Sequence, residues 1–489
     1  MIDIPFEIGA EKLHEKCAVT AAVMNDGEQV SALLNFMMLY ALQHRGVEAS
    51  GIASQTPSGN LKIHREPAFV KDAFDEETLE SLRSDVAIGH NRYSTNGSKF
   101  AHMQPVDDRN IGYAMATNGN LPVTDYLETF LKKNNVRTDE MNDSELKAHA
   151  IAQHIRNGHD LPDAIELAHP LFRGAYSSVA MHDGMVVAFR DPKGIRPLEL
   201  GTIDGGYVVA SETCALDMLG ATAIRSVKPG EMVTITSQGI ETKQFAEGSE
   251  KLDIFEFVYF ARPDSYLYGE NVAMVRRRLG EQLAEEHPHL AENPNAVIIP
   301  VPETAVPIAE GLAERLDLPV INSAIVKNRY VGRTFMLQTQ ALRQRFLDIK
   351  HSLIPEFIKG KDVYLPDDSI VRLNTARAIV QKTLAAGAKS VTFLSASPPI
   401  RFPDYYGIDT PSQKELAAAN MTVEQMRQEI YAEYLGFLSL SRMIAATNQP
   451  PERFNLSAFN GVYPIGIGNH KSEICQPEDM SYVDLDLAS

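Results

Sequence analysis

The sequence of 489 residues has no tryptophan, only three cysteines and fewer basic than acidic side chains. Cys17, Cys214 and Cys475 are too few for a four-cysteine zinc or iron–sulfur site, and they form no disulfide framework. This cysteine usage is typical of a reducing compartment. The formal net charge of −18 disfavours nucleic acid as the main partner, because an acidic surface repels a polyanion. A small phosphorylated substrate needs only a local positive pocket and is not excluded.

Long apolar runs and an N-terminal signal are also missing. The longest apolar stretch, around 32–42, contains Asn35 and is too short to span a bilayer. The first sixteen residues have neither the basic start nor the apolar core of a secretory signal. We therefore expect a cytoplasmic protein that has no membrane and no nucleic acid as partner. At roughly 150 residues per domain, the length predicts two to four domains.

The pattern of the chain changes near 240–255. Before this point, short apolar runs separated by turn residues predict many strands, beginning with the buried run Cys17–Met24, and few helices, such as 32–43 and 145–156. Runs of strands of this kind predict sandwiched antiparallel sheets in an α+β arrangement. After it, strands alternate with helices, which predicts an α/β domain with a parallel sheet. The expected strands are 296–300, 320–323, 362–366 and 390–395, and the expected helices are 303–316 and 373–387. The tail after about Phe459 is expected to be extended or poorly ordered.

Four polar motifs in the first half each follow an apolar run, where loops at strand ends present functional groups. They are Gln43-His44-Arg45-Gly46, Gly89-His90-Asn91-Arg92-Tyr93-Ser94-Thr95, Thr117-Asn118-Gly119-Asn120-Leu121 and Asn142-Asp143-Ser144-Glu145. Each feature also has a purely structural interpretation: Asn118-Gly119 as a hairpin turn, 142–145 as a helix N-cap, Arg92 in a surface ion pair and Cys17 as a buried thiol. Together and in this order, the motifs resemble the glutaminase domain of class II glutamine amidotransferases, which have the N-terminal-nucleophile hydrolase fold.

This resemblance implies an αββα sandwich whose nucleophile, Cys17, becomes N-terminal when residues 1–16 are removed as a propeptide. A free α-amine titrates near ~7.7–8.0 and can activate the thiol of its own residue. Thiolate attack on the carboxamide of glutamine creates an oxyanion, for which the resemblance assigns the Asn118 side chain and the Gly119 N–H as donors. In the glutamine pocket, Arg92 suits the α-carboxylate, Asp143 suits the α-ammonium, and Arg45 supports the pocket. Ala18, Thr117 and Val47 replace residues that are usual in the family, and none of them is a catalytic group.

Motifs of the second half narrow the resemblance to the glutamine phosphoribosylpyrophosphate amidotransferases. They are Phe260–Ser265 (FARPDS), 327–335 (KNRYVGRTF), Asp191–Leu198 (DPKGIRPL), Val301–Thr304 (VPET) and Asp367–Arg372 (DDSIVR). The resemblance implies a glutaminase domain at 17–250, a phosphoribosyltransferase domain at 251–465 and a tail at 466–489. Ammonia released from glutamine then displaces pyrophosphate from phosphoribosylpyrophosphate and gives phosphoribosylamine, the first step of purine synthesis. We also expect purine nucleotide effectors and a homo-oligomer.

The run Val363–Ser369 (VYLPDDS) supplies the independent signal for the second site, because an apolar strand ends there in adjacent acids. Carboxylates at the carboxyl end of a strand can hold ribose hydroxyls and a Mg²⁺ ion bound to pyrophosphate. An acidic turn between strand and helix is the alternative. The predicted cofactor is Mg²⁺, and the resemblance adds Thr304 to Asp367 and Asp368 at the metal. The residues predicted to bind phosphoribosylpyrophosphate are Asp367, Asp368, Ser369, Thr375, Lys327 and Arg333.

A basic segment at 327–350 stands out in this acidic chain. It carries six basic residues, Lys327, Arg329, Arg333, Arg343, Arg345 and Lys350. The cluster predicts a lid over a polyphosphate, which agrees with the resemblance, and a solvated charged run is the alternative.

One segment departs from the family pattern. After Arg372 the family has Gly-Thr-Thr, whose N–H groups hold the 5′-phosphate at a helix N-terminus, and this chain has Leu373-Asn374-Thr375. Leucine adopts a left-handed backbone at a cost, and its side chain is expected to crowd the phosphate. Pro366 also removes a ladder N–H from a central strand. These differences motivate an alternative function, a diverged paralogue with a working glutaminase and a lost or altered phosphoribosyl acceptor site. A third class, a non-enzymatic binding or regulatory module, requires that Cys17 never becomes N-terminal.

Overall fold

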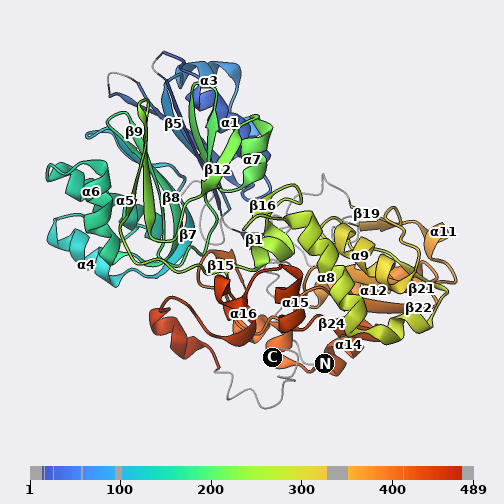
Figure 1. The fold of residues 1–489 in the computed structure, drawn as a ribbon. Coiled ribbons are helices and arrows are strands. Elements are labelled where there is room, and N and C mark those ends of the chain that lie inside the picture. The colour runs from blue at the N-terminus through green and yellow to red at the C-terminus, as the bar shows by residue number, and fades with distance from the viewer. Residues whose placement is uncertain are drawn as a thin grey trace.

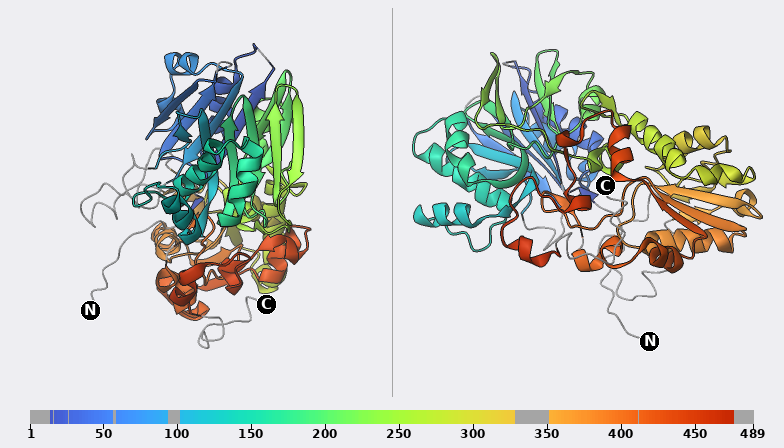
Figure 2. Two further views of the ribbon diagram at one scale, coloured as in Figure 1. Left: turned by 90° about the vertical axis from the view of Figure 1, so that its left-hand side faces the viewer. Right: turned by 60° about the horizontal axis from the view of Figure 1, so that its bottom comes forward.

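The structure is a computed structural model that describes residues 14–15, 17–25, 27–56, 59–93, 102–327, 351–410 and 412–475. These residues form two lobes, which are separated in Figure 1 and in the right-hand view of Figure 2. The first lobe ends with β14 (Gly239–Gln244), and the second begins with β15 (Leu252–Asp253), which pairs with β25 (Phe454–Asn455). No helix in the described part of the chain is long and apolar enough to cross a membrane.

Two antiparallel sheets stack face to face in the first lobe. One has the strand order β12-β10-β11-β2-β5-β3-β4 and the other β14-β13-β9-β8-β7-β6. Small and β-branched side chains such as Val19 of β2, Ala116 of β7 and Val179 of β8 are fully buried between the sheets. The remaining bounds are β2 Cys17–Met24, β3 Ala49–Gln55, β4 Leu61–Glu66, β5 Val86–Arg92, β6 Val106–Asp108, β7 Tyr113–Val123, β8 Arg173–His182, β9 Met185–Arg190, β10 Glu199–Ile203, β11 Gly206–Ala210, β12 Thr222–Ser226 and β13 Glu231–Thr236.

Helices cover the outer face of each sheet. On one side α1 (Ser31–Ala41) and α7 (Thr213–Met218) bury Met38 and Ala215 against β2 and β11. On the other side α4 (Asp125–Lys133), α5 (Asp143–Arg156) and α6 (Leu161–Ala168) pack on the second sheet. Alternate residues of β7 serve the two layers, since Ala114 faces the other sheet and Met115 faces the helices. The predicted αββα sandwich is confirmed, although α4 and α6 were not expected.

The second lobe is built on a parallel sheet with strand order β18-β21-β22-β24. Both faces are buried: Ile298 of β18 contacts one apolar cluster and Val297 contacts the other. α8 and α9 cover the first face, and α12 and α14 cover the second. The bounds are β18 Ala296–Ile298, β21 Asp362–Asp367, β22 Ser390–Ser395, β24 Tyr434–Phe437, α8 Val272–Glu286, α9 Val306–Leu316, α12 Asn374–Ala385 and α14 Val423–Ile430. The predicted α/β domain is confirmed, but the strand expected at 320–323 is wrong, because Val320 makes only one isolated bridge to Ile298.

The described part of the C-terminal segment is ordered against the first lobe. A short helix, α16 (Ser457–Asn460), is followed by a 3-10 helix at Gly468–Glu473. Ile467 and Ile474 are buried in a cluster with Ala175 and Ile195 of the first lobe, and the red segment below α4 in Figure 1 follows this path. The expectation of an extended or poorly ordered tail is therefore wrong as far as residue 475, because these isoleucines find an apolar contact on the other lobe.

Two residues just before Cys17 pair with the second lobe. β1 (His14–Glu15) lies antiparallel to β23 (Ile408–Asp409), with His14 opposite Asp409 and Glu15 opposite Ile408. The chain therefore reaches Cys17 from the second lobe before it enters the sheet of the first.

Candidate active site

Cys17 begins β2, one of the central strands of the first sheet, and only 7% of the residue is exposed. Arg92, at the end of β5, lies directly opposite Cys17 in the strand register and is also buried. The alternative in which Arg92 belongs to a surface ion pair is therefore wrong. The two predicted residues come together because two non-adjacent segments pair with the register that their apolar runs require.

The side chain of His90 connects this region to the second sheet. His90 lies opposite Val19 in the register, and its Nε2 is 3.2 Å from the carbonyl oxygen of Thr117. Burial, together with the nearby charge of Arg92, lowers the pKa of His90 to about 3, so the ring is neutral. Because Thr117 precedes Asn118, this contact brings the predicted oxyanion donors to the end of the sandwich that holds Cys17.

Asn118 and Gly119 lie inside β7, so the hairpin-turn interpretation is wrong. Gly119 has a φ of +138°, and a Cβ atom added there would lie 2.1 Å from the carbonyl oxygen of Ala175 on β8. Only glycine therefore fits between β7 and β8 at this position. The side chain of Asn118 is fully buried, so β7 holds both predicted donors in a rigid strand.

Asp143 begins α5, and its Oδ2 accepts a hydrogen bond of 3.0 Å from the backbone N–H of Leu121. Asn142 and Glu145 form a reciprocal capping box at the start of the same helix. The N-cap interpretation of 142–145 is thus correct for Asn142 and Glu145. Asp143 instead contacts β7 at Leu121, two residues beyond Gly119.

Arg45 is buried in an ion network that joins the two lobes. Its guanidinium donates to Glu212 of the first lobe and, at 2.8 Å, to Oε1 of Glu256 of the second. Burial acts to raise the pKa of Glu212, but His44 and Arg45 hold that pKa well below its ordinary value. Glu212 also accepts 2.6 Å and 2.9 Å hydrogen bonds from the Ser265 hydroxyl and the Arg262 N–H, both within the FARPDS motif. This geometry suits a residue that supports the pocket.

The segment 404–409 of the second lobe lies directly against β7, the strand that carries the predicted oxyanion donors. Asn120 donates from Nδ2 to the carbonyl oxygen of Tyr405 at 2.9 Å, and Arg196 donates from Nε to that of Tyr406 at 3.2 Å. Gly407 follows with a φ of +120°, and a Cβ atom added to it would lie 3.1 Å from the Cα of Gly119. The backbones of the two lobes therefore meet at the residue that is predicted to bind the oxyanion.

The predicted acids of the second site lie at the carboxyl end of β21, and both Asp367 and Asp368 are buried. The N–H of Asp368 donates to Oδ1 of Asp367 at 3.0 Å, and Ser369 donates from its hydroxyl to Oδ1 of Asp368 at 2.9 Å. The segment that leads to Thr304 runs beside this strand, because Val301 donates its N–H to the carbonyl oxygen of Pro366 at 3.0 Å. β21 continues through Pro366, so the missing N–H does not interrupt the sheet.

The backbone of Leu373 is not in the left-handed conformation that the comparison with the family's glycine suggested. Its φ is −81° and its ψ is −6°, an ordinary right-handed conformation at the start of α12. Its side chain is 6% exposed and belongs to the apolar cluster on this face of the parallel sheet. The expected strain and the expected crowding of the phosphate are both wrong, because the leucine side chain is buried in the core. Thr375 lies in the first turn of α12, two residues further on.

A cavity of about 260 Å³ lies between the two lobes. It connects the helix-end motif at 44–45 with the segment 303–304 beside the acids of β21. Lys327, predicted to bind the polyphosphate, is 3.8 Å from Glu303 at its rim. The lining residues are His44, Arg45, Tyr259, Phe260, Ala261, Arg262, Pro263, Arg276, Glu303 and Thr304. Arg333 and the rest of the basic segment beyond Lys327 lie outside the described residues.

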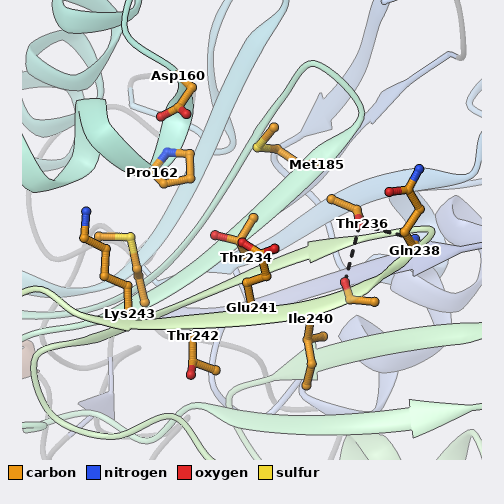
Figure 3. A pocket seen from close by; sticks show the side chains of 12 residues that line it. Asp160, Pro162, Met185, Thr234, Thr236, Gln238, Ile240, Glu241, Thr242 and Lys243 are labelled. Atoms are coloured by element: carbon orange, nitrogen blue, oxygen red, sulfur yellow. Dashed lines mark hydrogen bonds between the residues drawn. The ribbon is translucent and has the colours of Figure 1, made fainter.

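A larger hollow, of about 630 Å³, lies on the edge hairpin β13–β14 (Figure 3). Threonines line much of it, and its cation, Lys243, pairs with Glu166 at 2.5 Å and with Asp163 at 3.7 Å. None of the residues predicted from the sequence lines this hollow.

The side chains predicted at the metal offer oxygen atoms only: the carboxylates of Asp367 and Asp368 at the end of β21 and the hydroxyl of Thr304, in the segment that begins beside this strand at Val301. Hard oxygen ligands are those that Mg²⁺ prefers, and it is commonly held by one or two carboxylates together with substrate phosphates. Within the described ranges, no group of three or more His, Cys, Asp or Glu side chains could hold a metal ion. The residues therefore fit a Mg²⁺ ion that arrives with a phosphorylated substrate.

Sequence reasoning missed several residues of the interlobe region. Glu212 and Glu256 are the buried acids that hold Arg45, and isolated glutamates in apolar surroundings gave the only signal for them. Tyr405 and Gly407 act through their backbones, which leave no chemical signature in a sequence. Lys147 is a fully buried lysine behind β7, and its spacing of four residues from Asp143 was the signal that could have found it.

Comparisons with known proteins extend over nearly the whole chain. A family model for the glutamine amidotransferase domain matches residues 90–218. The chain is 39% identical over 476 residues to an amidophosphoribosyltransferase of Synechococcus elongatus, with 95% of each chain covered. It is 37% identical to that of Bacillus subtilis, with 93% of this chain and 95% of the relative covered. Among solved structures, the glutamine phosphoribosylpyrophosphate amidotransferase from Bacillus subtilis complexed with ADP and GMP has a TM-score of 0.84 at 35% identity, and the match covers 93% of this chain and 98% of the other.

Proposed function

The chain belongs to the amidophosphoribosyltransferase family, and from this premise we propose how its own residues carry out the reaction. An enzyme of this family transfers the amide nitrogen of glutamine to phosphoribosylpyrophosphate, in the first step of purine synthesis. The likeness covers both lobes at once, and this is the observation that carries the assignment. The alternative of a diverged paralogue was based on Leu373 at the phosphate loop. Because Leu373 is buried in the core of its domain, it no longer supports that alternative.

We propose that the first lobe hydrolyses glutamine through Cys17 once residues 1–16 have been removed. The new α-amine takes the thiol proton, and the thiolate attacks the carboxamide carbon. The Asn118 side chain and the Gly119 N–H bind the resulting oxyanion, while Arg92 and Asp143 bind the α-carboxylate and the α-ammonium. The C–N bond then breaks, the leaving nitrogen takes up the proton and departs as ammonia, and water hydrolyses the thioester to glutamate. The strand pairing of Cys17 with Arg92 and the fixed conformation of β7 support this proposal.

We propose that the second lobe binds phosphoribosylpyrophosphate at the carboxyl end of β21. Asp367 and Asp368 hold the ribose hydroxyls, Thr375 and the N-terminus of α12 bind the 5′-phosphate, and Lys327 and Arg333 bind the pyrophosphate. Ammonia attacks C1 of the ribose and displaces pyrophosphate. Asp367, Asp368 and Thr304 would hold Mg²⁺, which when bound supplies positive charge to the pyrophosphate oxygens. Ser369 holds the carboxylate of Asp368 in place.

The interlobe cavity supports a direct route for the ammonia. It joins the helix-end motif of the first lobe to the segment 303–304 of the second, and Arg45 fixes one wall through Glu212 and Glu256. Tyr259 and Phe260 contribute apolar surface to this route, whose lining also contains charged side chains such as Arg45.

We further propose the division into a propeptide at 1–16, a glutaminase domain at 17–250, a transferase domain at 251–465 and a C-terminal segment at 466–489. The structure of a relative complexed with ADP and GMP supports purine nucleotides as effectors of this chain. A homo-oligomer working in the cytoplasm is proposed on the family and on the cysteine usage.

Two measurements test this function directly. Pyrophosphate release from phosphoribosylpyrophosphate is followed with glutamine and, separately, with ammonium chloride at alkaline pH. We expect both nitrogen sources to support turnover in the presence of Mg²⁺. Intact-protein mass then decides whether the active chain begins at Cys17, and a chain that keeps residues 1–16 and still cleaves glutamine would refute the proposed base.

A further inference from the structure

Lys147 is a fully buried lysine in the second turn of α5, with 1% of the residue exposed. Its ammonium donates to the hydroxyl of Thr117 at 2.5 Å and to that of Ser178 at 2.9 Å, and these two hydroxyls are 2.7 Å apart. The ring of Tyr176 lies 4.6 Å from the Nζ atom, in the range of a cation–π contact. The side chain therefore crosses from the helix layer to β7 and β8.

Burying a cation at this position is energetically unfavourable. Among the residues that the structure describes, no carboxylate lies within 4.0 Å of the Nζ atom. Burial lowers the pKa of Lys147 to about 7, although the charges of Asp143 and Asp191 act to raise it. An apolar side chain of similar length would fill the same space without this cost. The two hydroxyls would remain paired with each other, so stability alone does not explain a lysine here.

α5 holds β7 at two points that flank the predicted oxyanion donors. Asp143, in the first turn, accepts from the N–H of Leu121, and Lys147, one turn later, donates to the hydroxyl of Thr117. Residues four apart lie on the same face of a helix, and residues 117 and 121 are four apart on the strand. Asn118 and Gly119 lie between these two contacts.

Every polar group of Thr117 has a hydrogen-bond partner. Its N–H donates to Oε1 of Gln104 at 2.8 Å, its carbonyl oxygen contacts His90, and its hydroxyl accepts from Lys147. The first two contacts fix the backbone of β7, one of them to β5 of the other sheet. Gln104 also reaches α5, because its Nε2 donates to the hydroxyl of Ser144 at 3.4 Å, and Lys147 is the residue of α5 that contacts Thr117 directly.

We propose that Lys147 is a positioning residue for glutamine cleavage, which holds α5 against β7 so that the oxyanion donors and the Asp143 carboxylate keep their relative places. This inference rests on the roles proposed above for Asn118, Gly119 and Asp143. Lys147 touches no reacting atom and acts through Thr117. A shift of either element separates the two ends of the bound glutamine, since its ammonium is held by α5 and its carboxamide oxygen by β7.

The test compares Lys147→Met with the matched variant Arg156→Met. Arg156 lies in the last turn of the same helix, where it pairs with Asp108, away from residues 117–121. For Lys147→Met we expect kcat/KM for glutamine to fall about tenfold, with KM raised and kcat lowered, because small misplacements of binding groups have effects of this order. The ammonia-dependent rate and the melting temperature are expected to stay at or above the wild-type values. Arg156→Met should keep the glutamine-dependent rate while it lowers the melting temperature.

A double-mutant cycle with Thr117→Val separates positioning from a general structural role. If Lys147 acts through the hydroxyl of Thr117, adding Thr117→Val to Lys147→Met changes kcat/KM for glutamine less than twofold, although Thr117→Val alone lowers it severalfold. Additive effects, an equal loss of the ammonia-dependent rate, or an unchanged glutamine-dependent rate in Lys147→Met would each overturn the inference. If Lys147→Met does not fold, Lys147→Gln takes its place in the same cycle. The wild-type protein tests the underlying function separately, because ammonia-dependent turnover without any glutamine-dependent turnover would refute the glutaminase itself and the inference with it.

Discussion

Replacing Gly407 by alanine should impair the glutaminase and spare the transferase. The added Cβ atom would lie 3.1 Å from the Cα and 3.3 Å from the carbonyl carbon of Gly119, so one backbone must shift by a few tenths of an ångström. Gly119 is already in close contact with β8, since a Cβ atom added to it would lie 2.1 Å from the carbonyl oxygen of Ala175. The φ of +120° adds about 1–2 kcal/mol of backbone strain for any residue other than glycine. Because removing one oxyanion donor costs roughly 10²–10³ in rate, a partial displacement should cost about ten- to a hundredfold.

The assay is pyrophosphate release with glutamine and with ammonia as separate nitrogen sources. Gly407→Ala should lose most of the glutamine-dependent rate and keep the ammonia-dependent rate, since the acids of β21 lie elsewhere in the second lobe. Gly239→Ala is the matched control, because Gly239 has a similar φ of +141° and open space around it. It should lose a comparable amount of stability and no activity. Equal glutamine-dependent rates in the two variants would refute the argument that segment 404–409 sets the oxyanion geometry.

Three further outcomes are expected. Cys17→Ala should abolish glutamine-dependent turnover and spare the ammonia-dependent rate, and equal loss of both in the same assay would contradict a two-site scheme. Leu373→Gly should lower the free energy of unfolding by about 2–5 kcal/mol in urea denaturation, because it removes a buried side chain. It should not tighten phosphoribosylpyrophosphate binding in calorimetry, and tighter binding would restore the interpretation in which the leucine crowds the phosphate. Between pH 7 and about 10 the unfolded chain keeps a proton on Lys147 that the folded protein releases, since burial lowers its pKa to about 7 from an ordinary 10.5. The stability of the wild type relative to Lys147→Met should therefore rise with pH across this window and stay level below it, and urea unfolding of both proteins at pH 6, 7, 8 and 9 tests the sign.

The sequence was sufficient to predict both layer architectures, because local patterns carry that information. The run at Cys17–Met24 is a strand with the predicted bounds, and the strand at 390–395 is likewise found at Ser390–Ser395. Strands buried on both faces leave uninterrupted apolar runs, and crossover helices leave a regular alternation with them. The prediction of a strand at 320–323 was wrong because it also relied on the local pattern alone. Apolar residues at a sheet edge can make one bridge without extending a ladder.

The seam between the two lobes could not be predicted from the sequence. The pairing of Arg45 with Glu256 joins residues 211 positions apart, and no periodicity connects them. Leu373 shows the opposite error, in which a single substitution was given a backbone conformation taken from a glycine. The actual conformation depends on how the apolar core of that lobe accommodates the side chain, which is a tertiary effect.

Segment 404–409 contacts the first lobe through its main chain and through two of its side chains. The carboxylate of Asp404 lies 3.8 Å from the guanidinium of Arg196, and Tyr406 is buried in a cluster with Ala175 and Ile195. Asn120 and Arg196 bind carbonyl oxygens, and Gly407 contributes only its backbone. Such a seam depends on the path of the chain at Gly407 and on the side chains of Asp404 and Tyr406, so the two halves can diverge independently only where these features persist. For protein engineering, a chimaera with a transferase half from a distant relative should retain glutamine-dependent turnover when the path of this segment, Asp404 and Tyr406 are preserved. It should lose that turnover when they change, however high the overall identity.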